Sequence, residues 1–308
     1  MDNLQVMNLL NVILLATLRM STPLILTTIG ATFSVRAGIS ELGCEGMMIA
    51  GAFFGVLGSY ITGNAWLGML FGVIFGVVFS LIHGVLHVIF KVNQTISGMG
   101  VNLLSAAIAP LLIKLVWHTN SITTNVDSFN SLENSFIKDI PFIGNFLSQQ
   151  NIIFYMAIMI MVLSWLYLFR TKSGLRMRVV GENPTAASTI GINVVAYKLV
   201  GTMICGALSG LGGVFLSLGQ LSQYVDGMTA GRGYIAMVIN AFGRYSPIGA
   251  TVGSLFFGFF DALQIIFQSS AIPSQFLMML PYAITLVVLT IGLKRTRLPA
   301  GVGKHHDL

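Results

Sequence analysis

A few charged and amide side chains stand inside long apolar stretches of this sequence. Glu45 and Arg232 each precede a glycine, and Asn102 lies in the middle of an apolar stretch. A carboxylate accepts hydrogen bonds, a guanidinium donates them and an amide does both, so this set could bind a neutral polar molecule. Each residue could equally serve the structure, through a salt bridge or an interhelical hydrogen bond. Weaker binding candidates of the same kind are Asp226, Asn240, Asp261 and Gln264.

Other kinds of site chemistry are not indicated. His83 and His87 are four residues apart and could share a metal ion, but the sequence offers no third ligand beside them. The glycines of Gly301–Lys304 are followed by His305, so the G-x-x-x-x-G-K-[ST] phosphate loop of ATPases is not formed. The sequence also lacks a serine with a nearby base, which is the pattern that would suggest a hydrolase. We therefore expect no catalytic residue, no metal and no cofactor in this chain.

The composition indicates that these side chains lie in a membrane. Of the 308 residues, 55% are hydrophobic and 8% are charged, whereas soluble domains have roughly 25% charged residues. The apolar runs are continuous and long enough to cross a bilayer, which favours helices over an alternating β-barrel. The 34 glycines suit close helix packing in lipid. The sequence predicts an all-α integral membrane protein with residues 1–308 in one transmembrane domain.

About nine transmembrane segments are predicted, and they include half-helices. The seventh segment has only twelve residues, which reach about 18 Å, whereas a hydrocarbon core is roughly 30 Å thick. We expect a half-helix there, completed by the non-helical stretch Gln220–Gly231, which must line a cavity or be packed by protein. The nine segments are 4–30, 39–60, 65–90, 95–117, 152–169, 196–218, 232–243, 247–268 and 276–293.

The basic residues predict the orientation of the chain. Cytoplasmic connections are rich in Lys and Arg, and the richest connections here are Arg170–Arg178 and the tail from Lys294 to Lys304. Placing both in the cytoplasm puts the C-terminus inside, and it puts the N-terminus and the long loop 118–151 outside. This bias accounts for the net charge of +6, so we expect no nucleic-acid partner.

Two glycine-rich segments of the sequence resemble one another. Gly46–Gly55 and Gly233–Gly243 share a pattern of glycine, alanine and aromatic residues, and a helix with a G-x-x-x-G pair follows each of them. In the predicted topology these two following helices run in opposite directions. An inverted repeat with half-helices at matching positions is a known plan of transporters. Chance similarity among glycine-rich membrane helices is the alternative.

The predicted cytoplasmic connection 170–195 contains a short helix with clear end signals. Asn183 can cap this helix, Pro184 fits its first position, and Gly191 suits the left-handed residue that ends it. Two turns are too few for stability in water, so the helix needs a docking surface. That surface is either the rest of this protein at the membrane or a partner protein.

This connection resembles the coupling-helix motif, G-x-N-x-x-A-A-x-x-x-G-I, of permease subunits of bacterial ABC importers. The superfamily carries branched-chain amino acids, ribose and nucleosides, and the nucleoside branch is the most similar. The residues in the coupling segment are Gly181, Glu182, Asn183, Pro184, Ala186, Ala187 and Gly191. Segments that resemble the nucleoside branch are Gly38–Ile39, Glu45–Met48, Gly51–Phe53, Ile96–Gly98, Val101–Leu104 and Gly231–Ala236. Ser40–Gly46 departs from the usual family pattern at Cys44, which leaves Glu41 without an assigned role.

The resemblance implies the rest of a transport machine in the bacterial cytoplasmic membrane. The implied partners are cytoplasmic ATP-binding subunits, a second permease subunit, which is a homologue or another copy of this chain, and an external substrate-binding lipoprotein. ATP would bind to the partner subunits, whose closure would push on the coupling helices. The loop 118–151 would meet the binding protein. The expected function is a nucleoside permease with Glu45 and Asn102 on its translocation path.

Three alternatives stay open on the sequence. The same machine could carry a branched-chain amino acid or a monosaccharide. An ion-coupled secondary transporter would also use half-helices and intramembrane carboxylates, but it needs no docking helix. A membrane enzyme would need a catalytic constellation, which the sequence does not offer.

Overall fold

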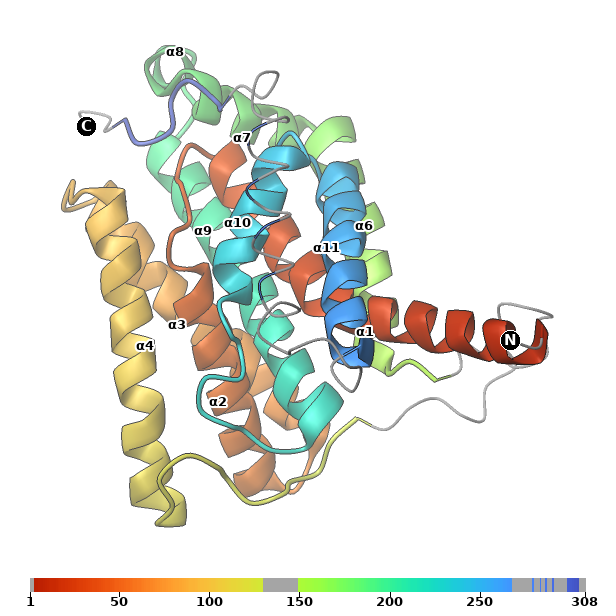
Figure 1. Ribbon diagram of the computed structural model, residues 1–308. Helices are drawn as coiled ribbons and strands as arrows, with labels where there is room; N and C mark the ends of the chain where they lie inside the picture. Colours follow the sequence, from red (N-terminus) through yellow and green to blue (C-terminus); the bar gives the residue numbers. More distant parts are fainter. Residues whose placement is uncertain are drawn as a thin grey trace.

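The computed structural model of the protein describes residues 3–129, 149–267 and 298–304 and the isolated positions Met279, Ala283, Leu286 and Thr290. Within these residues the regular secondary structure is helical, apart from one isolated β-bridge between Ile122 and Val225. The helices in chain order (Figure 1) are α1 (Asn3–Arg36), α2 (Cys44–Thr62), α3 (Ala65–Val88), α4 (Gln94–Trp117), α6 (Ile152–Arg170), α7 (Lys172–Glu182), α8 (Pro184–Thr189), α9 (Val194–Leu216), the π-helical turn η2 (Ser217–Leu221), α10 (Arg232–Phe242) and α11 (Pro247–Phe267).

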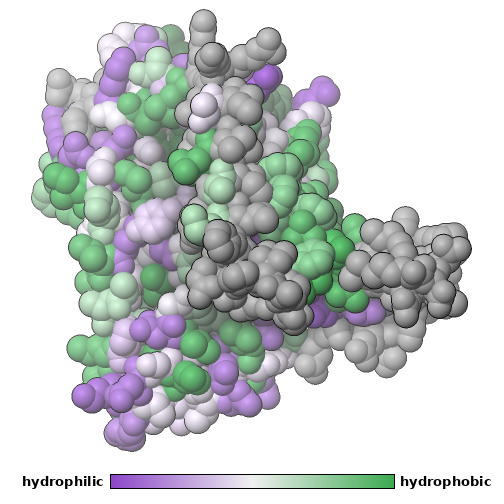
Figure 2. Space-filling view, in the orientation of Figure 1, coloured by the Kyte–Doolittle hydropathy of each residue, from purple (hydrophilic) through white to green (hydrophobic). Residues whose placement is uncertain are grey.

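Seven of the described helices are long and apolar enough to cross a membrane, and the all-α membrane fold is confirmed. They are α1 from Asn11, α2, α3, α4, α6, α9 with η2, and α11. Figure 2 shows hydrophilic side chains gathered at both ends of the bundle, with hydrophobic ones around most of its middle. The ninth predicted segment, 276–293, lies outside the described residues except for isolated positions. The nine-segment count therefore stays a prediction.

Glycines allow the helices at the centre of the bundle to approach closely. Gly51 of α2 lies against Gly210 of α9, and a Cβ atom at Gly51 would overlap the Gly210 backbone. Gly76 of α3 lies against Gly206 of α9 in the same way. Because larger residues would separate these backbones, the glycine content is explained by the packing of α2, α3 and α9.

The predicted half-helix is present as α10 with 11 residues, whereas its counterpart in the predicted repeat, α2, has 19 residues and is long enough to cross a membrane. Both helices begin inside the bundle and run in opposite directions (Figure 1). Helix α10 ends beside the end of α1, where Arg36 Nε donates to the carbonyl oxygen of Tyr245 at 2.7 Å. Helix α2 ends at the other face, where Ser59 Oγ donates to the carbonyl oxygen of Asp127 at 2.7 Å. A full span follows each helix, as an inverted repeat predicts.

The described start of the 118–151 loop packs along the stretch that leads into α10. The Thr123 backbone N–H donates to the Tyr224 carbonyl oxygen at 3.1 Å, and that of Asp226 donates to the Ser121 carbonyl oxygen at 2.9 Å. These bonds satisfy backbone groups that no helix satisfies. The two non-helical connections therefore support each other at the end of the bundle opposite α8.

Candidate functional site

The site is built where the N-terminus of α2 meets the N-terminus of α10. Glu45, in the first turn of α2, accepts hydrogen bonds on Oε1 from Thr229 Oγ1 at 2.6 Å and from the Gly231 backbone N–H at 3.0 Å. Its Oε2 atom accepts from the Gly233 backbone N–H at 2.7 Å. A buried carboxylate thus satisfies the free N–H groups and the positive dipole end of α10.

Asn102 of α4 holds the other side of this junction. Its Oδ1 atom accepts from the Gly46 backbone N–H at 2.8 Å, at the start of α2. Its Nδ2 atom donates to the Leu42 carbonyl oxygen at 2.8 Å and to the Tyr234 hydroxyl at 2.9 Å. The amide therefore links α4, α2 and α10 through both of its polar atoms.

Two glycines are required by the short distances at this junction. A Cβ atom at Gly233 would overlap the Glu45 backbone, and one at Gly46 would lie 2.8 Å from the Asn102 Cα atom. These contacts explain why the matching segments of the predicted repeat each begin with a glycine. We call the cluster of Glu45, Asn102, Thr229 and the two glycines the half-helix junction.

The junction gives Glu45 and Asn102 structural partners, while their place on a translocation path stays a prediction. Both side chains are buried, and their hydrogen-bonding atoms already bond to neighbouring protein groups. Tyr234 was absent from the predicted site because a tyrosine in an aromatic-rich sequence gives no signal of its own. Its hydroxyl bonds to Asn102, but 47% of the residue is exposed.

Arg232 and the weaker candidates are spread over α10, α11 and the connection before α10. Arg232 donates from Nη1 to the carbonyl oxygens of Met228 at 3.2 Å and Thr229 at 3.3 Å, so it closes the turn that begins α10. Asn240 is buried and accepts from Thr32 Oγ1 of α1 at 2.8 Å. Asp226 is exposed, and Asp261 is half-buried in α11. Arg232 lies beside Glu45, because Gly231 and Gly233 both donate to that carboxylate, whereas Asn240 bonds to α1 instead.

The predicted coupling helix is present as α8, with the expected end signals. The Asn183 side chain accepts from the Ala186 backbone N–H at 3.0 Å, Pro184 is the first residue of the helix, and Gly191 has a φ of 78°. The preceding segment forms helix α7, which begins where Thr171 Oγ1 accepts from the Gly174 backbone N–H at 3.0 Å. The connection is thus a pair of helices.

The two alanines of α8 differ in burial. Ala187 is fully buried and packs with Val180 of α7 and Val194 of α9, whereas Ala186 is exposed. Ile190, at the end of α8, is 70% exposed. One face of α8 therefore packs on the permease, and its other face is uncovered within the described residues.

The end of the chain folds back onto this helix pair, which the sequence did not predict. The Gly301 backbone N–H donates to the Gly181 carbonyl oxygen at 2.9 Å, and Lys198 Nζ of α9 donates to the Lys304 carbonyl oxygen at 2.8 Å. The Gly303 backbone N–H donates to the Gly38 carbonyl oxygen at 3.2 Å. The segment 298–304 therefore connects the helix pair, α9 and the start of the α1–α2 connection.

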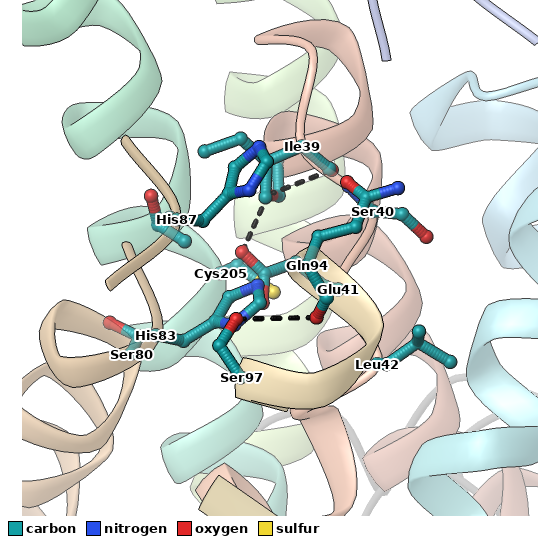
Figure 3. Close-up of polar contacts among 12 residues, drawn as sticks. Ile39, Ser40, Glu41, Leu42, Ser80, His83, His87, Gln94, Ser97 and Cys205 are labelled. Atoms are coloured by element: carbon teal, nitrogen blue, oxygen red, sulfur yellow. Dashed lines mark hydrogen bonds and ion pairs between the residues drawn. The ribbon is translucent and has the colours of Figure 1, made fainter. Parts of the chain in front are cut away.

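Glu41, which has no role in the sequence motif, lies in a buried polar cluster (Figure 3). Its Oε1 atom accepts from Ser34 Oγ at 2.6 Å, and its Oε2 atom lies 3.7 Å from His83 Nε2. The His83 Nδ1 atom is 2.8 Å from Ser97 Oγ. This cluster ties the α1–α2 connection to α3 and α4, and it shows that His83 serves a hydrogen-bonded contact between helices.

Glu41 should make the stability of the protein depend on pH. Burial raises the pKa of Glu41 from 4.5 to about 8, against the smaller opposing effect of its bond to Ser34. The folded chain then holds this proton more tightly than the unfolded chain, so the contribution of Glu41 to the stability should fall as the pH rises from about 4.5 to about 8. Glu41→Gln, which cannot ionise, should weaken that fall in a series of melting temperatures measured in detergent. An identical pH dependence in both proteins would contradict this assignment.

A polar cavity of about 440 Å³ opens beside η2, at the end of the bundle where α2 ends. Arg19 of α1 donates from Nη2 to the Gln149 carbonyl oxygen at 3.2 Å and accepts on its own carbonyl oxygen from Gln220 Nε2 at 3.2 Å. Arg19 thus both joins two segments and lines a cavity. Other lining residues include Ser128, Asn151, Gly219 and Ser222.

The family of the chain follows from its match to known permeases. Residues 13–289 match the family described as branched-chain amino acid transport system / permease component. The chain belongs to this permease family. The match spans the half-helix junction and the α7–α8 pair, and it confirms the family resemblance found in the sequence.

Two curated relatives are similar to this permease over nearly their whole length. The nucleoside ABC transporter permease protein NupC of Lactococcus lactis subsp. cremoris (strain MG1363) is 36% identical, with 98% of this chain and 99% of the relative covered. The guanosine ABC transporter permease protein NupQ of Bacillus subtilis (strain 168) is 35% identical, with 97% and 98% covered.

A solved structure has a similar fold. An ABC transporter in an inward-facing conformation superposes with a TM-score of 0.50 at 13% identity, and the match covers 90% of this chain and 84% of that one. This likeness concerns the fold alone. Together, the family and the helices show that the chain is a multi-pass membrane permease of an ABC transporter.

Proposed function

We propose that this permease imports nucleosides, driven by ATP that separate cytoplasmic subunits hydrolyse. The observation that carries the proposal is the identity of 36% and 35%, over nearly the full chain, to permeases named for nucleosides and guanosine. A nucleoside is neutral and presents hydroxyl and amide groups, so its passage does not call for a fixed charge. The machine further includes a second permease subunit and an external substrate-binding lipoprotein, in the bacterial cytoplasmic membrane.

Uptake by cells tests the cargo. A strain lacking this permease, with and without a plasmid copy, would be given radiolabelled guanosine, uridine, leucine and ribose. Loss of nucleoside uptake alone, restored by the plasmid, is the expected result. Loss of leucine or ribose uptake with unchanged nucleoside uptake would contradict the proposal and indicate a branched-chain amino acid or a monosaccharide as the cargo.

The uncovered face of α8 supports the proposal that α8 docks on the ATP-binding subunit. Ala186 and Ile190 lie on this face, whereas Ala187 and Pro184 are buried against the permease. A helix of six residues is stable only when packed. The permease supports one side of α8, and the ATP-binding subunit would cover the other.

The same proposal fixes the orientation of the chain, with α8 in the cytoplasm and 118–129 outside. Asn120 and Thr189 are exposed residues on these two sides, and Cys44 and Cys205 are both buried. In a protein with alanine at both native cysteines, Asn120→Cys should react with an impermeant thiol reagent added to intact cells. Thr189→Cys should react only after the cells are opened. The opposite pattern would reverse the orientation.

A further inference from the structure

Tyr234 lies near the middle of the membrane and exposes its ring there. Helix α10 ends at Phe242, beside the end of α1. Tyr234 precedes Phe242 by eight residues, which corresponds to about 12 Å along the helix. A hydrocarbon core is roughly 30 Å thick. The exposed ring is therefore remote from the interfacial zone, where tyrosine is ordinarily enriched in membrane proteins.

The surroundings of Tyr234 are not suited to lipid. The chain immediately before α10 is non-helical, and Ala230, four residues before Tyr234, is exposed in it. Exposed non-helical backbone at membrane depth is tolerated only beside a water-filled cavity or against protein, because hydrocarbon cannot satisfy its polar groups. The face that carries the Tyr234 ring therefore borders either an aqueous path or another protein.

The half-helix junction holds this ring in a fixed position. Asn102 Nδ2 donates to the Tyr234 hydroxyl at 2.9 Å, and Asn102 is itself held by Gly46 and Leu42. The hydroxyl is thus hydrogen-bonded inside the protein, while 47% of the residue's surface is exposed. A rigid aromatic face loses little conformational entropy when a flat molecule stacks on it.

We propose that the Tyr234 ring is the surface on which the base of a nucleoside stacks as it crosses the permease. This inference rests on the proposed function and adds the residue that recognises the base. Stacking suits a carrier of several nucleosides, because every base has an aromatic face. It also assigns a structural purpose to the Asn102 amide, which positions the ring.

Three variants in the complete transporter separate the ring from the hydroxyl. Tyr234→Leu removes the aromatic face, and Tyr234→Phe keeps it but loses the bond to Asn102. Phe256→Leu is the matched control, since Phe256 of α11 is 45% exposed and lies with Phe242 and Gly243 at the opposite end of α10 from Tyr234. Initial uptake of radiolabelled guanosine and uridine would be measured, with amounts of assembled complex determined by co-purification of the ATP-binding subunit.

Tyr234→Leu should reduce uptake by at least about fivefold, the effect of losing one base-stacking contact. The reduction should be larger for guanosine than for uridine because the purine has the larger face. Tyr234→Phe should lose clearly less uptake than Tyr234→Leu, because it keeps the ring and loses only the bond that positions it, and Phe256→Leu should stay within about twofold of the wild type. Equal losses in the Leu and Phe variants of Tyr234 would overturn the inference, as would unchanged uptake in Tyr234→Leu with normal assembly. A wild-type transporter without nucleoside uptake would instead overturn the proposed function.

Discussion

Ile190→Glu should reduce transport by tenfold or more while the permease still inserts and folds. Ile190 is 70% exposed on the uncovered face of α8, so a glutamate there meets no other part of the described permease. In the assembled transporter it would place a charge in a docking surface. Interface hot spots of this kind contribute about 2 kcal/mol or more, which is worth more than a factor of ten in binding.

The measurements are nucleoside uptake and co-purification of the ATP-binding subunit. Ile190→Val is the matched control, because it keeps an apolar side chain at the same position and should leave both nearly unchanged. Ala187→Glu is unsuitable as a test, since Ala187 is fully buried and the charge would disrupt the permease itself. Normal uptake and normal co-purification in Ile190→Glu would remove α8 from the coupling contact.

Glu45→Leu should destabilise the permease strongly. The carboxylate accepts from Thr229, Gly231 and Gly233, and leucine would leave all three donors without an acceptor inside the protein. Each buried donor left unsatisfied costs about 1–3 kcal/mol. Glu45→Gln keeps the size and one acceptor oxygen, so its loss of stability should be intermediate.

Thermal unfolding of the purified permease in detergent measures this effect. Asp226→Asn provides the control, because Asp226 is an exposed carboxylate close to α10 in sequence. We expect the lowest melting temperature for Glu45→Leu and a higher one for Glu45→Gln. Asp226→Asn should melt at the same temperature as the wild type. A melting temperature of Glu45→Leu equal to that of the wild type would show that the junction does not depend on the carboxylate.

Local signals in the sequence predicted the parts of the fold that depend on neighbouring residues. The shortness of the segment after Gly231 predicted α10, and Asn183, Pro184 and Gly191 predicted both ends of α8. Capping and length are properties of a few consecutive residues, so one sequence is enough to recognise them. Helix α7 was missed because its polar composition resembles that of a loop.

Contacts between distant residues could not be predicted in the same way. Glu45 meets Gly233, which is 188 residues away, and Glu41 meets His83 on another helix. Periodicity shows which residues share a face, but it does not show which faces meet. The burial of Ala187 and the exposure of Ala186 also depend on how α8 packs against α7 and α9. The structure therefore agrees with the predicted fold class, and it adds the contacts that decide which substitutions test each residue.

ATP-driven uptake by reconstituted vesicles tests the account most directly. The purified permease with its ATP-binding subunits and second permease subunit would be placed in proteoliposomes, with the binding protein outside and ATP enclosed. We predict that radiolabelled guanosine and uridine accumulate only with ATP, and that Ile190→Glu abolishes this accumulation. Accumulation of leucine or ribose without nucleosides, or of nucleosides without ATP, would contradict the account.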